Sequence, residues 1–259
     1  MWIKEIPNNY MEEKSFAVDA IFLWKSDNHP IYVMDNHLCA TWCWLQECDF
    51  HSSYNFMHID QHSDLASPGD PSIISFLREN PHVSFKEYKA LTIEKKNYPF
   101  FKWDNYIRAC QYLFPNWFSV NMFCTQEIND FRESILGYKR FPIYSINYID
   151  VCKELTQYIN EPSENLSPLD ENWKNKWILN IDLDFFWTDY KIKLLDDEFI
   201  RDLARRINNA IDNIEVITIA LSPDCVGGGE MKERWANAFK ALDIFKEEID
   251  GLGEFTTPC

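Results

Sequence analysis

Two hydrophobic patterns alternate along the chain, and each predicts a different element. Runs rich in β-branched and aromatic residues predict strands, whereas apolar residues spaced three and four apart predict helices. The predicted strands are Phe16–Trp24, Ile31–Met34, Tyr54–Ile59, Phe118–Phe123, Pro142–Ile149, Trp177–Leu183 and Val216–Leu221. The predicted helices are Leu38–Cys48, Pro71–Glu79, Phe85–Lys96, Asp104–Leu113, Asp130–Gly137, Asp150–Ile159, Asp196–Ile211 and Glu230–Ile249.

This alternation predicts an α/β fold with three layers, αβα, around a mostly parallel central sheet. Several predicted strands are apolar almost throughout, which is typical of strands buried on both faces. We expect a single domain over residues 1–259, because α/β folds of this length are often undivided and the polar segment 161–175 is typical of a surface loop. Ligands of such sheets bind at the carboxyl ends of the strands.

Composition and charge exclude several classes of protein. With 46% hydrophobic and 16% aromatic residues, the chain can bury a large core, which excludes intrinsic disorder and a coiled coil. The 25 basic and 41 acidic residues give a net charge of −16, which repels nucleic acid and anionic lipid. We therefore expect neither as a partner. Acidity also concentrates cations, although solubility is the more common reason for it.

The apolar runs, the first residues and the cysteines of the sequence predict the cellular location of the protein. No apolar run approaches the roughly 20 residues that span a bilayer, and residues 1–14 lack a targeting pattern. The eight cysteines are scattered without a CxxC pair, so we expect all of them to be reduced. A cytoplasmic protein is the expectation.

The richest group of metal-binding residue types follows the predicted strand Tyr54–Ile59. Its sequence is Asp60-x-His62-x-Asp64, and alternate positions of an extended segment point the same way, so all three side chains are candidates for one site. Two carboxylates and an imidazole suit Mn²⁺, Fe²⁺ or Zn²⁺ better than Ca²⁺. The alternative is a loop in which Asp60 caps a helix and His62 forms local hydrogen bonds.

A second acidic pair lies near the end of another predicted strand. Asp182-x-Asp184 falls within the apolar run WILNIDLDFFW, where two buried carboxylates cost several kcal/mol unless a cation neutralises them. His37 follows the short apolar strand Ile31–Met34, which makes a position on a neighbouring strand end plausible. A lone histidine is more often structural.

Together these residues resemble the metal site of the ureohydrolase superfamily, which contains arginases, agmatinases and formiminoglutamases. Its pattern, His…Asp-x-His-x-Asp…Asp-x-Asp, is complete here in His37, Asp60, His62, Asp64, Asp182 and Asp184. The resemblance implies an arginase-like fold and two Mn²⁺ ions about 3.5 Å apart, which activate water for attack on a guanidinium carbon. It also implies that one ion is held by His37, Asp60, Asp64 and Asp182, and the other by Asp60, His62, Asp182 and Asp184.

The chain departs from the free-arginine enzymes after Asp64. Those enzymes continue with polar residues that grip the α-amino and α-carboxyl groups, whereas here Leu65, Ala66, Ser67, Pro68 and Gly69 follow. The shuttle histidine of arginases has no counterpart in that loop, and His82 is the only candidate downstream. Without that grip, we expect a substrate whose α-amino and α-carboxyl groups are in peptide bonds. The segments NHLCATW, HIDQHSDL, NIDLDFFW and SPDCVGGGE resemble those of the peptide arginases, which convert arginine residues of ribosomal precursor peptides to ornithine. An arginine-containing precursor peptide is the expected partner.

The guanidinium anchor is expected in the loop after the predicted strand Val216–Leu221. Arginase-type sites place a carboxylate near the end of a late strand, and both Asp224 and Glu230 are candidates in SPDCVGGGE. We predict Glu230 as the anchor and, with Asp182, as a catalytic residue, although an acid that complements a helix dipole is the competing interpretation of Glu230.

Two other functions remain open. The first keeps the fold and changes the substrate: a small-molecule ureohydrolase acting on agmatine or a guanidino acid, or a related metal-dependent deacetylase. The second is a metal-stabilised module that binds a basic peptide without turning it over. The sequence does not determine the number of subunits.

Overall fold

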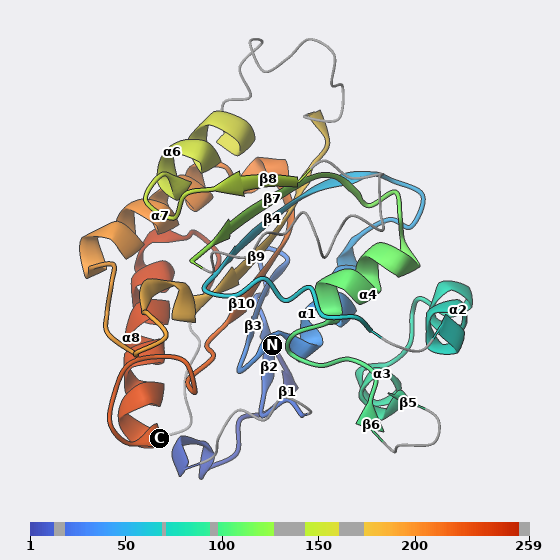
Figure 1. Ribbon diagram of the computed structural model, residues 1–259, viewed down its shortest axis with the longest axis horizontal. Helices are drawn as coiled ribbons and strands as arrows, with labels where there is room; N and C mark the ends of the chain where they lie inside the picture. The colour runs from blue at the N-terminus through green and yellow to red at the C-terminus, as the bar shows by residue number, and fades with distance from the viewer. Residues whose placement is uncertain (13–18, 69–70, 94–97, 127–142, 161–173, 254–259) are drawn as a thin grey trace.

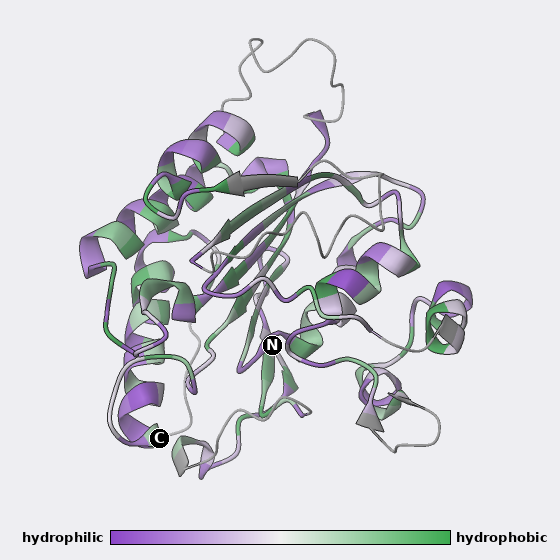
Figure 2. Cartoon of the chain, in the orientation of Figure 1, coloured by the Kyte–Doolittle hydropathy of each residue, from purple (hydrophilic) through white to green (hydrophobic). Residues whose placement is uncertain are grey.

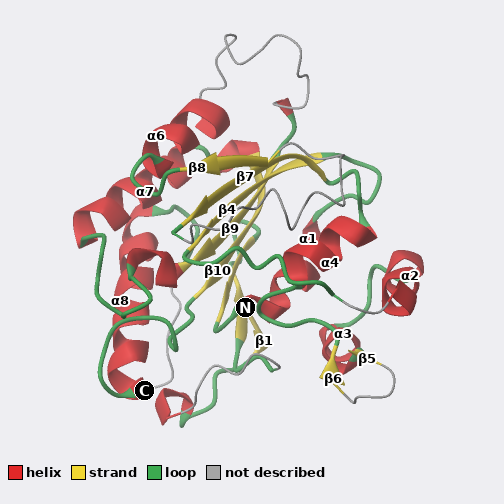
Figure 3. Ribbon diagram, in the orientation of Figure 1, coloured by secondary structure: helices red, strands yellow, loops and turns green. Residues whose placement is uncertain are grey.

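The computed structural model describes residues 1–12, 19–68, 71–93, 98–126, 143–160 and 174–253. Helices cover both faces of a central sheet, which gives the three layers of an αβα fold (Figure 1; Figure 3). The predicted α/β class with a mostly parallel sheet is confirmed. No helix in the described ranges is long and apolar enough to cross a membrane.

The sheet has eight strands among the described residues, in the order β1-β2-β3-β10-β9-β4-β7-β8. The strands are β1 (Trp2–Lys4), β2 (Leu23–Lys25), β3 (Ile31–Met34), β4 (Tyr54–Asp60), β7 (Phe118–Thr125), β8 (Ile143–Ile146), β9 (Trp177–Asp182) and β10 (Ile214–Ala220). From β3 to β8 every neighbouring pair is parallel, whereas β1 and β2 add an antiparallel edge. The late strands β9 and β10 lie between the early strands β3 and β4.

Two hydrophobic cores hold the helices on the sheet. One face is covered by α6 (Val151–Leu155), α7 (Asp197–Asn209) and α8 (Met231–Glu248), and the other by α1 (Ala40–Glu47), α2 (Pro71–Glu79), α3 (Phe85–Ala90) and α4 (Tyr106–Leu113). Figure 2 shows hydrophobic residues along the central strands, and β4 and β9 are buried at every position. Burial on both faces explains why these strands are apolar almost throughout.

The structure differs from the predicted elements at the edges of the fold. In the predicted strand Phe16–Trp24, only Leu23 and Trp24 are in β2; residues 16–18 lie outside the described part. The helix predicted to reach Lys96 ends at Ala90, because Leu91 is extended and the β-branched pair Thr92–Ile93 forms β5 against β6 (Tyr98–Pro99). The predicted helix Asp130–Gly137 and most of the polar segment 161–175 also lie outside the described residues.

Candidate metal centre

Three strands deliver the predicted ligands to one edge of the sheet. β4 ends at Asp60 and β9 ends at Asp182, so both carboxylates lie at carboxyl ends of parallel strands. His37 begins the short helix η2 (His37–Cys39), which follows β3 and is capped by the Asn36 side chain. The His37 Nε2 atom lies 3.3 Å from the Ile181 carbonyl oxygen, which places the ring over the end of β9.

The side chains of all six predicted ligands converge. The Nδ1 atom of His37 lies 3.5, 3.4 and 3.5 Å from carboxylate oxygens of Asp60, Asp64 and Asp182. The Nδ1 atom of His62 lies 3.6 Å from Asp60 Oδ1 and 3.3 Å from Asp184 Oδ2. Asp60 therefore belongs to both groups and presents one oxygen to each.

A turn, not an extended segment, brings the later ligands into place. The strand stops at Asp60, and Asp64 adopts the left-handed φ of 52°. Asp184 lies in the 3-10 helix η5 (Leu183–Phe186), capped by the Asp182 side chain. The side chains meet, but the strand alternation that we expected to align them is not what brings them together. The turn after β4 and the 3-10 helix η5 after β9 do so instead. Asp60 Oδ1 accepts a hydrogen bond from the His62 backbone N–H at 2.7 Å, which closes the turn.

Further hydrogen bonds orient the two carboxylates after β9. Asp182 Oδ1 accepts from the backbone N–H of Asp184 at 3.0 Å, and its Oδ2 accepts from the Ser222 hydroxyl at 2.5 Å. Gln61 N–H donates to Asp184 Oδ1 at 3.3 Å. Ser222 follows β10 with a φ of 40°, a conformation unfavourable for a residue with a Cβ atom. Left-handed residues are often retained where they serve a site.

The site contains buried polar atoms that a metal ion would satisfy. Among the residues that the structure describes, His37 Nδ1 and Asp60 Oδ2 are buried and have no hydrogen-bond partner. Buried atoms of this kind are rare and costly without a partner. Donor atoms bound to one ion at about 2.1 Å in a tetrahedral arrangement are about 3.4 Å apart, close to the 3.3–3.6 Å separations from the two imidazoles. Carboxylates with imidazoles also fit Mn²⁺, Fe²⁺ or Zn²⁺.

Burial and mutual repulsion raise the pKa values of carboxylates in this cluster. Burial raises the pKa of Asp60 well above its ordinary value, and the charges of Asp184, Asp64 and Asp182 raise it further. Burial and the charge of Asp184 raise the pKa of Asp182 to about 8. Burial likewise raises the pKa of Asp64, although His37 opposes that rise. The folded chain therefore concentrates negative charge where it is hardest to solvate, as expected for a cation site.

The two predicted histidine ligands respond in the opposite sense. Burial lowers the pKa of His62, but its hydrogen bonds to Asp184 and Asp60 outweigh burial and raise the pKa to about 12. The pKa of His37 is also raised, because Asp64 and the charge of Asp182 outweigh burial. A quarter of the His62 side chain is exposed, against 1% of His37, so the site opens toward solvent on the His62 side.

Several residues at the centre are not predicted from the sequence. His58 lies within the same ligand-atom range of Asp60 and Asp64, and burial lowers its pKa well below the ordinary value. Tyr106, from α4, is fully buried and its hydroxyl bonds to Asp64. Cys225, expected only as one of the reduced cysteines, lies near the acidic cluster. Burial raises the pKa of its thiol, and the charges of Asp184, Asp182 and Asp60 raise it further.

Two residues that the sequence analysis missed, His58 and Ser222, do have a signal in the sequence. The spacing His58-x-Asp60 puts a third imidazole on the face of β4 that carries a ligand. Ser222 directly follows the predicted strand Val216–Leu221, just as the candidate ligands lie at or just after the ends of the other strands. Nothing in the sequence indicates Tyr106, because its contact depends on how α4 packs on the sheet.

The glycine-rich loop after β10 packs against the chain itself. A Cβ atom on Gly227 would lie 2.5 Å from the Lys191 carbonyl oxygen and 2.7 Å from the Trp187 ring, so only glycine permits this approach. Arg234 on α8 donates to the carbonyl oxygens of Gly228 and Gly229. The loop is thus held between α8 and the segment after β9.

The predicted guanidinium anchors lie in or beside this loop. Glu230 occupies the position before the first residue of α8, is exposed, and makes no capping hydrogen bond with its side chain. Asp224 is half-buried, and its backbone carbonyl lies 3.5 Å from Arg234 Nη1. Neither belongs to the groups of converging ligand atoms among the described residues. Their role as anchors stays a prediction. His82, the only downstream shuttle candidate, is exposed with its ring against Phe50.

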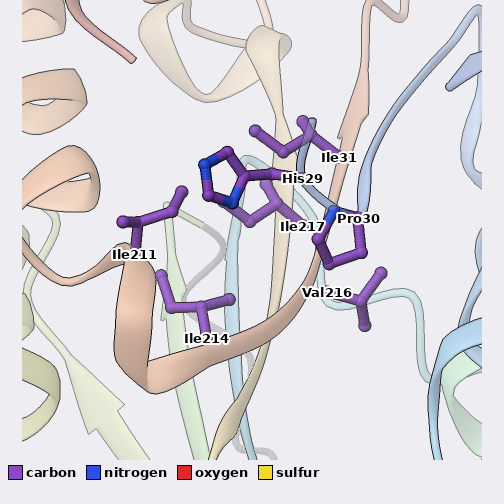
Figure 4. A pocket seen from close by; sticks show the side chains of 7 residues that line it. All are labelled: His29, Pro30, Ile31, Ile211, Ile214, Val216 and Ile217. Atoms are coloured by element: carbon purple, nitrogen blue, oxygen red, sulfur yellow. The ribbon is translucent and has the colours of Figure 1, made fainter. Parts of the chain in front are cut away.

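A small apolar hollow lies at the opposite edge of the sheet, where β3 and β10 begin (Figure 4). Its lining consists of His29, Pro30, Ile31, Ile211, Ile214, Val216 and Ile217. One imidazole and no carboxylate line it, so it lacks the donor set that gathers at the carboxyl edge.

Comparisons with known proteins give a distant likeness in structure. Neither protein-family models nor curated proteins match the sequence. The chain is similar to proclavaminate amidino hydrolase from Streptomyces clavuligerus, with a TM-score of 0.46 and 10% identity over 83% of this chain and 62% of that one. It is also similar to arginase from Helicobacter pylori, with a TM-score of 0.43 and 13% identity over 82% of this chain and 71% of that one. This chain thus spans less than two thirds of the Streptomyces clavuligerus protein, and its own activity is inferred from the geometry of the site.

Proposed function

We propose that this protein is a dinuclear manganese hydrolase that converts peptidyl arginine to ornithine with release of urea. The observation that carries the proposal is the convergence of two histidines and four aspartates into two groups that share Asp60. The atoms His37 Nδ1 and Asp60 Oδ2 are buried without a hydrogen-bond partner in the described part of the chain, which supports a site that cations would complete.

In this proposal the residues of the site have two roles, which are to hold the ions and to admit the substrate. His37, Asp60, Asp64 and Asp182 would hold one ion, and Asp60, His62, Asp182 and Asp184 the other. Divalent ions in such sites supply Lewis-acid activation of water at neutral pH. The Ser222 hydroxyl keeps Asp182 in a fixed orientation by donating to its Oδ2. The partly exposed His62 marks the side from which a substrate enters.

The reaction breaks one C–N bond of the guanidinium group. The oxygen of water joins the guanidinium carbon and becomes the carbonyl of urea, while the side-chain nitrogen leaves as the ornithine amine and takes up a proton. A carboxylate that pairs with the planar guanidinium would orient its carbon for this attack. Glu230 is our candidate for this anchor, with Asp224 as the alternative in the same loop.

The segment after Asp64 supports a substrate whose α-amino and α-carboxyl groups are already in peptide bonds. Leu65 is buried, and its carbonyl oxygen accepts from Arg108 Nη1 at 3.2 Å. The Ala66 backbone N–H donates to the Asp104 carbonyl oxygen at 2.8 Å. These backbone groups are occupied within the protein, so they do not supply the polar grip that the free-arginine enzymes place here.

Urea release tests the proposal. Purified protein with Mn²⁺ is given an arginine peptide acetylated at its N-terminus and amidated at its C-terminus, free arginine, and agmatine. We expect urea from the blocked peptide and little from the other two. Chelator-treated protein and the Asp182→Ala variant should release none. Turnover of agmatine or free arginine alone would indicate a small-molecule ureohydrolase. Tight peptide binding without urea would indicate a binding module.

A further inference from the structure

Three buried polar side chains form a row across the sheet directly beneath the candidate ligands. Thr218 on β10 and His58 on β4 both pair in register with Asn180 on β9. All three are 0% exposed, in a sheet whose neighbouring positions are apolar. Because side chains two residues apart share a face, His58 and Asn180 lie one step below Asp60 and Asp182. Buried polar groups in such a place are costly unless every one is bonded.

The hydrogen bonds in this row run in one direction. The Thr218 hydroxyl donates to Asn180 Oδ1 at 2.7 Å, while its oxygen accepts from the Trp44 indole N–H at 3.3 Å. With its oxygen fixed as the acceptor, the Asn180 amide has only its two N–H groups left. Its nitrogen lies 2.9 Å from His58 Nδ1 and 2.9 Å from the Tyr106 hydroxyl oxygen. Both amide hydrogens are thereby used.

That direction determines what His58 does. Because His58 Nδ1 accepts from Asn180, the neutral ring carries its proton on Nε2. The Nε2 atom lies 3.1 Å from the His62 carbonyl oxygen, so it donates to the backbone of the turn. An Nε2 that carries a proton has no lone pair for a metal, although His58 lies in ligand range of Asp60 and Asp64.

The same direction determines what Tyr106 does. Its hydroxyl oxygen accepts from Asn180, so its own proton is free to bond to Asp64. The row thus ends at two points of one turn, the His62 carbonyl and the Asp64 carboxylate. That turn needs support, because Asp64 has a φ of 52°.

We propose that Thr218 and Asn180, acting through His58 and Tyr106, position the turn from His62 to Asp64 for metal binding, and that His58 is a positioning residue and not a ligand. This inference rests on the metal centre of the proposed function. Partners that orient metal ligands typically change metal affinity by 10- to 100-fold when removed.

Two pairs of variants test the inference, with the Mn²⁺ dissociation constant from titration calorimetry and the metal content as readouts. Tyr106→Phe should weaken Mn²⁺ binding by about 10- to 100-fold. Tyr54→Phe is the matched control, because the Tyr54 hydroxyl accepts from the Asp49 backbone N–H at the opposite end of β4. It should bind Mn²⁺ within about 2-fold of the wild type, well below the roughly 10- to 100-fold loss expected when an orienting partner is removed.

The second pair separates positioning from ligation at His58. His58→Gln keeps a donor where Nε2 stood and should retain both ions, whereas His58→Leu removes the donor and should weaken binding as Tyr106→Phe does. Thermal unfolding of the metal-free variants identifies any general loss of fold.

Three results would overturn the inference. Equal Mn²⁺ affinity in Tyr106→Phe and Tyr54→Phe would remove the role of the tyrosine. Loss of one ion from His58→Gln would make His58 a ligand. A wild-type chain that binds no divalent metal would overturn both the proposed metal centre and this inference. That result differs from a change of affinity seen only in the variants.

Discussion

Replacing Asp182 with asparagine should stabilise the metal-free protein at neutral pH. Burial and the charge of Asp184 raise the pKa of Asp182 from 3.8 to about 8. A carboxyl whose pKa is raised by folding stabilises the fold while protonated, so its contribution is complete below about pH 4 and is lost as the pH rises toward 8. At about 1.4 kcal/mol per pKa unit, keeping Asp182 in the folded state costs roughly 4 kcal/mol at pH 7.

Asparagine removes this cost while retaining most of the contacts. Its oxygen can still accept from the Asp184 backbone N–H, which is 3.0 Å from Asp182 Oδ1. Its amide can donate to the Ser222 hydroxyl, which reverses the present bond. Allowing about 1 kcal/mol for the altered hydrogen bonds, we expect a gain of about 2–3 kcal/mol at pH 7, or roughly 5–10 °C in Tm. At pH 4 the two proteins should differ by less than about 1 kcal/mol.

The assay is thermal unfolding of chelator-treated protein at pH 4, 7 and 8, followed by tryptophan fluorescence. Asp35→Asn is the matched control, because Asp35 is equally buried but accepts from the backbone N–H groups of Ile21 at 2.8 Å and Phe22 at 3.1 Å. That variant should lose stability at every pH. Mn²⁺ should raise the Tm of the wild type and have little effect on Asp182→Asn. The reasoning is refuted if Asp182→Asn is destabilised at pH 7 as much as Asp35→Asn.

Four further predictions concern the loop after β10 and the metal itself. Ser222→Gly should be about 1 kcal/mol more stable in urea denaturation than Ser222→Ala, because only the alanine keeps a Cβ atom at a φ of 40°; equal stability would mean that no strain is stored there. Gly227→Ala should lose roughly 1–3 kcal/mol in the same assay, because its Cβ would meet the Lys191 carbonyl oxygen at 2.5 Å; a neutral result would contradict the close contact. Mn²⁺ affinity, measured by calorimetry at pH 6, 7 and 8, should rise with pH because Asp182, with a pKa of about 8, must lose its proton; a flat profile would argue against the raised pKa. Glu230→Gln should keep both metals yet lose kcat/KM on the peptide by roughly 30-fold to several thousand-fold; normal turnover by this variant, with loss in Asp224→Asn, would make Asp224 the anchor.

The meeting of the candidate ligands at one edge of the sheet was predictable because local rules place these residues. Asp60 and Asp182 end apolar strands, and parallel strands present their carboxyl ends at one edge. The route taken by Asp64 was not predictable, since its left-handed turn depends on the contact between Asp64 and Tyr106 and on the hydrogen bond from the His62 backbone N–H to Asp60. The same limit applies to the edge elements, where the short strands β1 and β5 carry too few residues for a pattern.

The row of Thr218, Asn180 and His58 could not be predicted from the sequence, for a different reason. His58 and Asn180 are 122 positions apart and are matched only by the register of two parallel strands. Either residue alone resembles an isolated polar residue in an apolar run. Register between distant strands is a property of the whole sheet, and no local spacing encodes it.

The place of β9 and β10 between β3 and β4 also bears on the order of events during folding. A chain synthesised only as far as residue 160 already contains His37 and Asp60, yet the two strands that separate β3 from β4 are still missing. Closing that gap requires contacts across more than a hundred residues, which form late because of their entropic cost. The cluster of His37, Asp60 and Asp182 therefore forms only after the last strand has inserted, so metal uptake at the proposed centre would report that the sheet is complete.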